Sequence, residues 1–168
     1  MAKNLCKDYF LQFVTCQNPL SHTASGVPKT QSASVASQDY LEQIFHLIEQ
    51  KGYARAVDIA RNLGISQASV SAMLKRLGNE ELVVYERYRG VILTQKGSDL
   101  AQYVIKRHEV LTRLLRHFGL DEDTIYQDVE GMEHHISAQT LKAFTILANE
   151  LDLDPGLCRT LKRKIRRA

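Results

Sequence analysis

Residues 56–77, AVDIARNLGISQASVSAMLKRL, decide the fold, because they contain two short helical patterns joined by a turn. Apolar residues recur every three or four positions on both sides of the turn, as in helices that bury one face. Ala60 is small where the two helix axes would approach, and Gly64 can adopt the left-handed conformation of a tight turn. Ser66 is a typical N-cap for the second helix. The combination predicts a helix-turn-helix, with a generic helical hairpin as the alternative.

The second helix of this motif is predicted to read DNA. Its apolar residues Val70, Met73, Leu74 and Leu77 would turn inward. Glutamine and serine can hydrogen-bond base edges, and alanine can contact a thymine methyl group. Small side chains would also let the helix lie deep in the major groove. The residues predicted to contact DNA are Gln67, Ala68, Ser69, Ser71, Ala72 and Lys75.

Residues 82–94, LVVYERYRGVILT, are rich in β-branched and aromatic residues. Two short runs flank a turn that ends at Gly90, which predicts a β-hairpin. A hairpin directly after a helix-turn-helix is the wing of a winged-helix domain. Arg87 and Arg89 at its tip are predicted to contact phosphate or the minor groove, with simple solvation as the alternative.

A further helix is predicted before the motif. Apolar residues recur at helical spacing from Tyr40 to Ile48, with Ser37 as the predicted N-cap and Gly52 as the predicted end. The preceding residues 1–36 include a linker rich in Ser, Thr and Gly. This segment has few large apolar residues and is expected to be a flexible extension.

Helical patterns also follow the hairpin. The first runs from Thr94 to Phe118 and is interrupted near Gly97. Gly119 is predicted to end it, and Asp121 to cap the next helix. Ser137 is predicted to cap another helix, which runs from Leu141 to Leu151 and is broken by Pro155 and Gly156.

The net charge of +3 is distributed unevenly along the chain. Residues 99–158 carry five basic and eleven acidic residues, whereas residues 159–168 carry six basic and no acidic ones. A basic tail of this kind is typical of segments that contact nucleic acid or another acidic surface, or that remain solvated.

The cysteine count and the hydropathy pattern indicate the compartment. Cys6, Cys16 and Cys158 are odd in number and lack a metal-binding spacing, so no disulfide framework is expected. No apolar run approaches the roughly 20 residues that span a bilayer. Lys7 and Asp8 interrupt the short apolar patch near the N-terminus, which makes it a poor secretory signal. We therefore expect a cytoplasmic protein without a membrane partner.

Residues 128–137, DVEGMEHHIS, carry the candidate chemistry. If this segment is helical, Glu130, Glu133 and His134 lie at positions i, i+3 and i+4 and share one face. Three such polar side chains are costly to bury unless a cation meets them, so a divalent metal site is predicted. A solvated helix face is the alternative. His135 is not included, because one position along a helix turns it about 100° away from His134.

Three other polar residues have an ordinary explanation when each is considered alone. Asp39 and Glu42 would favour the N-terminal end of their helix. His108 would most simply be a satisfied histidine of a long helix. If these residues converge with the 128–137 segment, however, four carboxylates would repel one another in one pocket. Two divalent cations would neutralise that charge, so metal would close an inter-helix contact that is loose without it.

Several short motifs resemble the manganese transport regulators, the manganese-sensing branch of the diphtheria-toxin-repressor family of metal-dependent transcriptional repressors. They are DYLEQI, QKGYAR, ERYRG, LTQKG, RHE and DVEGMEHH, and they fall in register between Ser37 and Leu151. The resemblance implies a homodimer that binds a palindromic double-stranded DNA operator and represses manganese-uptake genes. It also implies a binuclear Mn²⁺ site, with two ions per subunit.

The resemblance also implies which residues bind the metal. The family's ligand positions fall on Asp39, Glu42, His108, Glu130, Glu133 and His134, and each is a ligand-type residue here. The iron-sensing branch has methionine at the position of Asp39 and cysteine at that of Glu130. Replacing sulfur by oxygen ligands favours Mn²⁺, although Fe²⁺ and other divalent transition metals remain alternatives.

The expected fold is mostly α-helical with a small β wing. Its predicted segments are a flexible N-terminal extension (1–36), a winged helix-turn-helix DNA-binding domain (37–98), an all-helical dimerisation and metal-binding domain (99–158) and a basic tail (159–168). We expect a repressor with no organic substrate and no catalytic residues. The alternatives are an iron-responsive member of the same family, a di-metal carboxylate enzyme, and a winged-helix regulator that responds to an organic ligand.

Asp39→Met is expected to relax the preference for Mn²⁺ over Fe²⁺, because a soft thioether would replace a hard carboxylate. The measurement is binding to operator DNA in parallel titrations with the two metals. An unchanged metal-response profile would contradict the argument from hard ligands.

Overall fold

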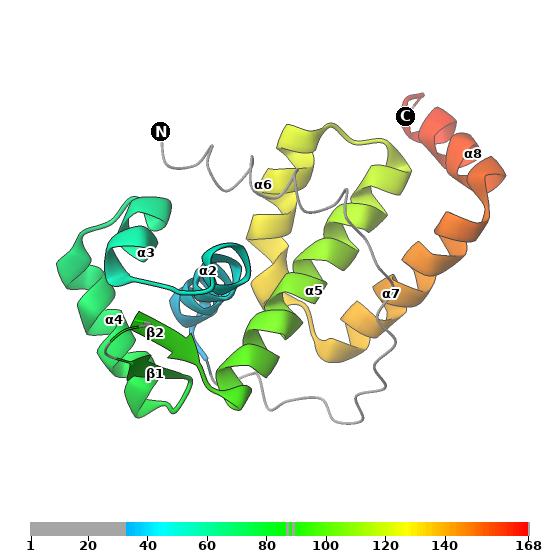
Figure 1. The fold of residues 1–168 in the computed structure, drawn as a ribbon. Helices are drawn as coiled ribbons and strands as arrows, with labels where there is room; N and C mark the ends of the chain where they lie inside the picture. The colour runs from blue at the N-terminus through cyan, green and yellow to red at the C-terminus, as the bar shows by residue number, and fades with distance from the viewer. Residues whose placement is uncertain (1–32, 87, 89, 168) are drawn as a thin grey trace. The chain divides into compact units, whose positions relative to one another are not determined.

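The computed structural model describes residues 33–86, 88 and 90–167, and it is mostly helical with one small sheet, as predicted. The chain forms two compact units, Met1–Tyr103 and Val104–Ala168, and the boundary between them falls within helix α5. The elements in chain order are α2 (Val35–Lys51), α3 (Ala56–Leu63), α4 (Gln67–Asn79), β1 (Val83–Glu86), β2 (Gly90–Leu93), α5 (Gln95–Phe118), α6 (Glu122–Met132), the 3₁₀ turn η2 (Glu133–His135), α7 (Ala138–Leu153) and α8 (Pro155–Ile165) (Figure 1).

Helix α2 begins one turn earlier than predicted. Its N-cap is Ser34, whose hydroxyl accepts a hydrogen bond from the Ser37 backbone N–H at 3.2 Å. Ser37 is fully buried in the first turn, so its prediction as the cap was wrong. Both serines can cap a helix, and the apolar pattern that begins at Tyr40 does not distinguish between them. Burial raises the pKa of the Tyr40 hydroxyl above its ordinary value.

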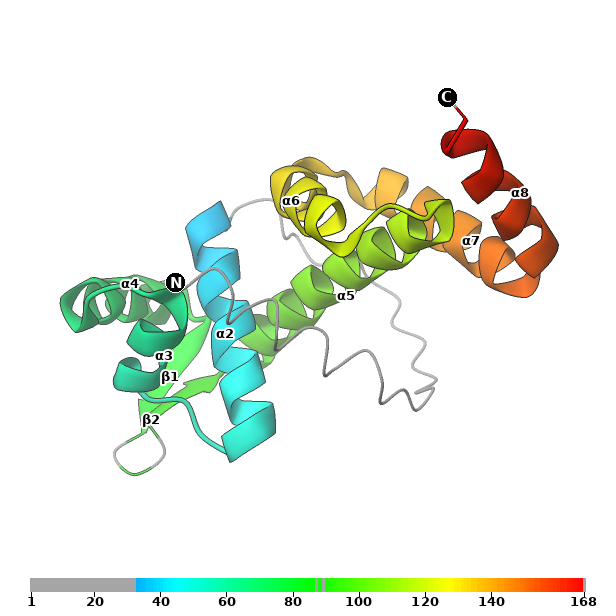
Figure 2. The same ribbon diagram turned by 90° about the horizontal axis from the view of Figure 1, so that it is seen from above.

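The predicted turn between the two short helices is confirmed. Helix α3 ends at Gly64, which has a φ of 67° and is therefore left-handed. Helix α4 begins after Ser66, whose hydroxyl accepts a hydrogen bond from the Ser69 N–H at 3.1 Å. Val70 and Leu77 are completely buried on the inner side of α4. Figures 1 and 2 show α3 and α4 next to the two-stranded sheet.

The wing is a two-stranded antiparallel sheet, as predicted. Strands β1 and β2 pair from Val83 opposite Leu93 to Glu86 opposite Gly90. The Val91 N–H donates to the Ala54 carbonyl at 2.8 Å, which fixes the segment before α3 against β2. The predicted DNA contacts Arg87 and Arg89 lie outside the described residues.

Helix α5 runs through Gly97 without a break, so the predicted interruption there was wrong. The Thr94 hydroxyl accepts a hydrogen bond from the Gly97 N–H at 3.0 Å and caps the helix. A Cβ atom at Gly97 would overlap the backbone carbonyl of Leu82. The glycine therefore serves the close approach of α5 to the backbone before β1, and does not end a helix.

The second unit is built from short, individually capped helices around the C-terminal part of α5. Asp121 and Ser137 cap α6 and α7 as predicted, with hydrogen bonds of 3.0 and 3.1 Å from Thr124 N–H and Thr140 N–H. Two buried clusters form its core. One contains Leu111, Ile125 and Val129, and the other Leu114, Ala148, Leu151 and Cys158.

The basic segment after α7 is helical. Pro155 is the first residue of α8, where a proline lacks an N–H that would be unpaired in any case. The Asp154 carboxylate accepts a hydrogen bond from the Leu157 N–H at 2.9 Å and caps the helix. Pro155 thus ends α7 and also begins α8. Among the described residues, none of the helices has the length and hydropathy needed to cross a membrane.

Gly97→Ala is expected to lower the free energy of unfolding by about 1–3 kcal/mol, because the added methyl group must displace the Leu82 backbone. Urea denaturation of the purified protein measures this change. Gly78→Ala in α4 is the matched control, because a Cβ there meets nothing closer than 4.0 Å. The control should gain up to about 1 kcal/mol from its better helix propensity. Equal effects of the two substitutions would contradict the close-packing role of Gly97.

Candidate metal centre

The candidate metal ligands lie where α6 changes into a 3₁₀ turn. Helix α6 ends at Met132, and Glu133–His135 form η2. The expectation of one α-helical face from Glu130 to His134 was therefore wrong at its C-terminal end. A 3₁₀ turn has three residues per turn, so its side chains point in other directions than those of an α-helix. The Glu133 side chain turns inward and is only 2% exposed, whereas His135 is exposed, and the exclusion of His135 from the site stays a prediction.

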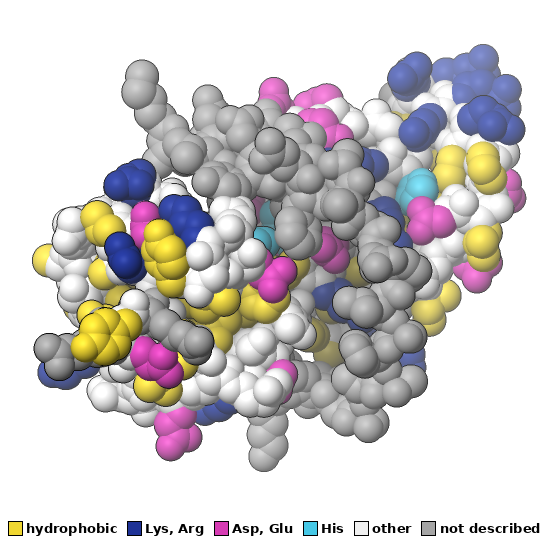
Figure 3. Space-filling view, viewed as in Figure 1, with side chains coloured by type: hydrophobic (Ala, Val, Ile, Leu, Met, Phe, Trp, Pro, Cys, Tyr) yellow, Lys and Arg dark blue, Asp and Glu magenta, His cyan; other side chains and the backbone are white. Residues whose placement is uncertain are grey.

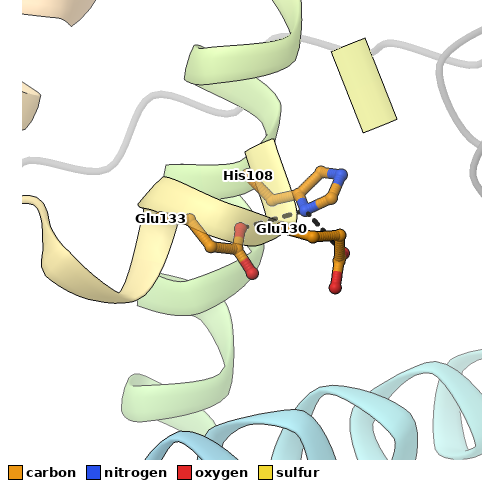
Figure 4. A group of neighbouring side chains, drawn as sticks. All are labelled: His108, Glu130 and Glu133. Carbon is orange, nitrogen blue, oxygen red and sulfur yellow. Dashed lines mark hydrogen bonds and ion pairs between the residues drawn. The ribbon is translucent and has the colours of Figure 1, made fainter. Parts of the chain in front are cut away.

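Three of the predicted ligands lie together in the second unit. His108 projects from α5 between the carboxylates of Glu130 and Glu133 (Figure 4). Its Nδ1 atom is 3.0 Å from Glu133 Oε2 and 3.8 Å from Glu130 Oε1. One ligand atom from each of the three side chains lies within 4.8 Å of the other two. Residues 25 positions apart in the sequence thus form one cluster.

The cluster has the dimensions and the chemistry of a site for a divalent cation. Oxygen ligands lie roughly 2.0–2.6 Å from such ions, so ligands on opposite sides of an ion are about 4–5 Å apart. The spacing of the three ligand atoms fits this range. His108 and Glu133 are buried, whereas the Glu130 side chain is 46% exposed and leaves the cluster open on one side. A buried carboxylate beside an imidazole and a second carboxylate is stabilised by a cation.

His134 lies next to this cluster and contacts both Glu133, which belongs to it, and Arg107. Its Nε2 atom is 3.4 Å from Glu133 Oε1, and its Nδ1 atom accepts from the Arg107 guanidinium at 3.3 Å. Glu133 therefore has one carboxylate oxygen near each of two imidazole rings. Arg107, a buried positive charge at the edge of the site, was not predicted from the sequence. Its position directly before His108 was the available signal.

The two remaining predicted ligands belong to the first unit. Asp39 and Glu42 are half-buried on α2. Glu42 Oε1 is 3.6 Å from Nε2 of His46 in the following turn. The participation of Asp39 and Glu42 in the metal site stays a prediction.

The predicted DNA-contacting side chains of α4 are all on its exposed face. They are Gln67, Ala68, Ser69, Ser71, Ala72 and Lys75. The Ser69 hydroxyl pairs with that of Ser66 at 2.9 Å, and the Ser71 hydroxyl donates to the Gln67 carbonyl at 2.9 Å. Ser69 and Ser71 would have to exchange these local bonds for contacts to DNA. The contacts of all six residues with bases stay a prediction.

Comparison with protein families assigns each half of the described chain. Residues 34–91 match the N-terminal DNA-binding domain of the iron-dependent repressors. Residues 94–157 match the metal-binding and dimerisation domain of the same family. The chain belongs to the iron-dependent repressor family. It is thus a DNA-binding transcriptional repressor with a domain for divalent metal and dimerisation, and the prediction that it is not an enzyme is confirmed.

Individual relatives agree with this assignment. The transcriptional regulator MntR of Bacillus subtilis (strain 168) is 43% identical over 125 residues, which are 74% of this chain and 88% of that protein. MntR of Bacillus pumilus (strain SAFR-032) is 51% identical over 100 residues, which are 60% of this chain and 69% of that protein. These relatives confirm the resemblance to the manganese transport regulators.

A solved structure of the manganese regulator SloR has a similar fold. It is 30% identical to this chain, with a TM-score of 0.60. The similarity covers 67% of this chain but only 53% of the SloR chain, so this protein spans about half of that structure.

Glu133→Gln is expected to weaken Mn²⁺ binding by roughly 100-fold or more, because the amide has no charge and only one oxygen to offer a metal. Isothermal titration of the purified protein measures the affinity. Asp128→Asn is the matched control, since it removes one carboxylate charge from an exposed position of α6, the helix that precedes Glu133. Equal, small losses in the two variants would remove Glu133 from the site.

Proposed function

We propose that this protein is a manganese-responsive repressor that binds two Mn²⁺ ions per subunit through Asp39, Glu42, His108, Glu130, Glu133 and His134. The observation that carries the proposal is the cluster of His108, Glu130 and Glu133, with all three ligand atoms within 4.8 Å of one another. Bound manganese would balance the negative charge of the carboxylates that the site brings together.

The surroundings of Glu133 support a two-ion site. Its Oε2 atom is near His108 and its Oε1 atom is near His134, at 3.0 and 3.4 Å. Each oxygen of this carboxylate would therefore have an imidazole donor beside it when metal is held here. In this proposal, His108, Glu130, Glu133 and His134 would all hold the ions, which would supply the positive charge that balances the two carboxylates.

The chemistry of the ligands supports manganese as the metal. Oxygen and imidazole nitrogen are the only donors in the proposed set, and Mn²⁺ prefers carboxylate ligands. Sulfur ligands at residues 39 and 130 would favour a softer metal. Nickel, copper and zinc ions bind most such sites more tightly than manganese, so selectivity must also depend on geometry and on metal availability.

Metal would control DNA binding through the connection between the two domains. In the proposal, residues 37–98 bind DNA and residues 99–158 form the homodimer. Asp39 and Glu42 precede the helix-turn-helix, whereas the other four ligands follow it, so shared ions would link the two parts of each subunit. The dimer would bind a palindromic operator of manganese-uptake genes, with recognition helices about 34 Å apart. Such a repressor acts on chromosomal DNA in the bacterial cytoplasm.

The required coupling between the metal site and DNA is modest. A tenfold gain in operator affinity corresponds to about 1.4 kcal/mol. Because the coupling is reciprocal, operator DNA should tighten Mn²⁺ binding by the same factor as Mn²⁺ tightens DNA binding.

Mn²⁺ is expected to increase operator affinity by at least about tenfold in the wild-type protein, and Glu133→Ala is expected to abolish this increase while the fold is kept. Duplexes selected from a randomised pool in the presence of Mn²⁺ serve as the operator probe. Fluorescence anisotropy with and without Mn²⁺ measures binding, and circular dichroism checks the fold. A parallel titration with Fe²⁺ tests the iron-responsive alternative.

Two results would contradict the proposal. Operator binding by the wild-type protein that does not depend on Mn²⁺ would remove the metal as the effector. Undiminished stimulation of the Glu133→Ala variant would show that another site carries the response.

A further inference from the structure

Helix α8 carries a stripe of basic side chains on one face. The members of this basic stripe are Arg159, Lys162, Arg163, Arg166 and Arg167. Their spacing of i, i+3, i+4, i+7 and i+8 places them on one side of a helix and of its last turn. All five line one surface hollow. Figure 3 shows the corresponding Lys and Arg side chains gathered over α8.

The stripe is held by a packed helix. Cys158 and Leu161, on the other side of α8, pack into the core cluster with Leu151. The carbon chain of Lys162 lies against Gly119, the residue that ends α5. The helix is therefore fixed by its apolar face, which leaves the basic residues on the exposed side.

The charges of the stripe are not balanced within the described part of the chain. No ion pair joins any of the five side chains to an acidic residue among residues 33–86, 88 and 90–167. Other basic residues of the same unit do have such pairs, including Arg113 with Asp152 at 3.2 Å and Arg116 with Glu122 at 2.8 Å. Like charges at positions i and i+4 destabilise a helix, so the stripe has a cost that an anionic partner would offset.

Neither the helix dipole nor the matched family domain accounts for the whole stripe. The helix dipole favours basic residues in the last turn of α8, but Arg159 lies in the first half of the helix. The matched family domain ends at residue 157, before the stripe begins. The stripe is thus a feature of this chain outside the domains that define the family.

We propose that the basic stripe of α8 binds the phosphate backbone of double-stranded DNA without regard to base sequence. The proposal rests on the function proposed above, because it adds a second DNA contact to a protein whose first domain binds DNA. The five positive groups lie along about 12 Å of α8 and the turn that follows it. Duplex DNA carries one negative charge per roughly 1.7 Å with both strands counted, so an equal length of duplex contains about seven phosphate charges, some of which would face the stripe.

The lining of the hollow favours DNA over an acidic protein as the partner. It is formed by Lys and Arg residues alone and has no apolar residue. Protein interfaces generally have an apolar core in which a few large side chains provide most of the affinity. A surface made only of cationic side chains instead suits the uniform charge of a phosphate backbone, which fixes position but carries no sequence information.

The test compares the salt dependence of DNA binding by the full-length wild-type protein and a fourfold variant. The variant carries Arg159→Gln, Arg163→Gln, Arg166→Gln and Arg167→Gln. Lys162 is kept, because its carbon chain packs on Gly119. The probe is a random-sequence duplex of about 40 base pairs, titrated with Mn²⁺ present at roughly 50–200 mM KCl.

The slope of log K against log salt is expected to fall in magnitude by about 0.9 for each phosphate interaction that the substitutions remove, or about 3.6 per subunit if all four arginines bind phosphate. Affinity at about 100 mM salt should fall at least tenfold. The matched control has lysine at the same four positions and should keep the wild-type slope, because the charge is unchanged. If the fourfold variant does not fold, Arg163→Gln with Arg167→Gln, both exposed, should give about half of the change in slope.

An unchanged slope in the folded glutamine variants would overturn the proposal, and so would equal losses in the glutamine and lysine variants. Stimulation by Mn²⁺ is measured on the selected operator in the same samples. A shallower salt dependence of the glutamine variants, together with intact stimulation of operator binding by Mn²⁺, supports DNA binding by the basic stripe. If Mn²⁺ does not stimulate even the wild-type protein, the proposed function fails, while the slope still decides the role of the stripe.

Discussion

The carboxylate of Glu133 is the group around which the candidate metal ligands of the second unit are arranged. It is almost completely buried, with an imidazole ring near each oxygen. A buried charge of this kind is costly unless positive charge or hydrogen bonds meet it. The helix packing around α5 and α6 brings His108 to one side and His134 to the other. The resulting cluster stabilises Glu133 and, in the proposed function, responds to manganese.

The first unit contains the DNA-binding domain of the family, and in the proposed function its helix α4 contacts the DNA. Its helices and strands are held together by close backbone approaches at Gly90 and Gly97, where a side chain would overlap a neighbouring carbonyl. Helix α4 buries Val70 and Leu77 and leaves its small polar residues exposed. The exposed residues of α4 are not among the buried core residues, so their side chains are available for the DNA contacts of the proposed function.

The acidic and basic residues, which are unevenly distributed along the sequence, also lie in different parts of the second unit. The acidic residues of the second unit include the carboxylates of the metal cluster, and six of its basic residues lie in residues 159–167, in α8 and the turn that follows it. The proposed partners differ accordingly: cations bind at the cluster of carboxylates, and DNA phosphate binds at the basic stripe. The separation allows one small chain to bind a cation and a polyanion without direct competition between the two sites.

The sequence by itself determined the features that depend on neighbouring residues. The turn at Gly64 and the cap at Ser66 follow from local hydrogen bonds, and the residue types of DVEGMEHHIS indicated metal ligands. The tertiary structure alone decided that α5 runs through Gly97, and that a 3₁₀ turn, which the α-helical periodicity did not reveal, buries Glu133. The meeting of Glu133 with His108 joins chain segments 25 residues apart. Capping and turn formation require only neighbours in the sequence, which a pattern records, but no local pattern specifies how distant segments pack.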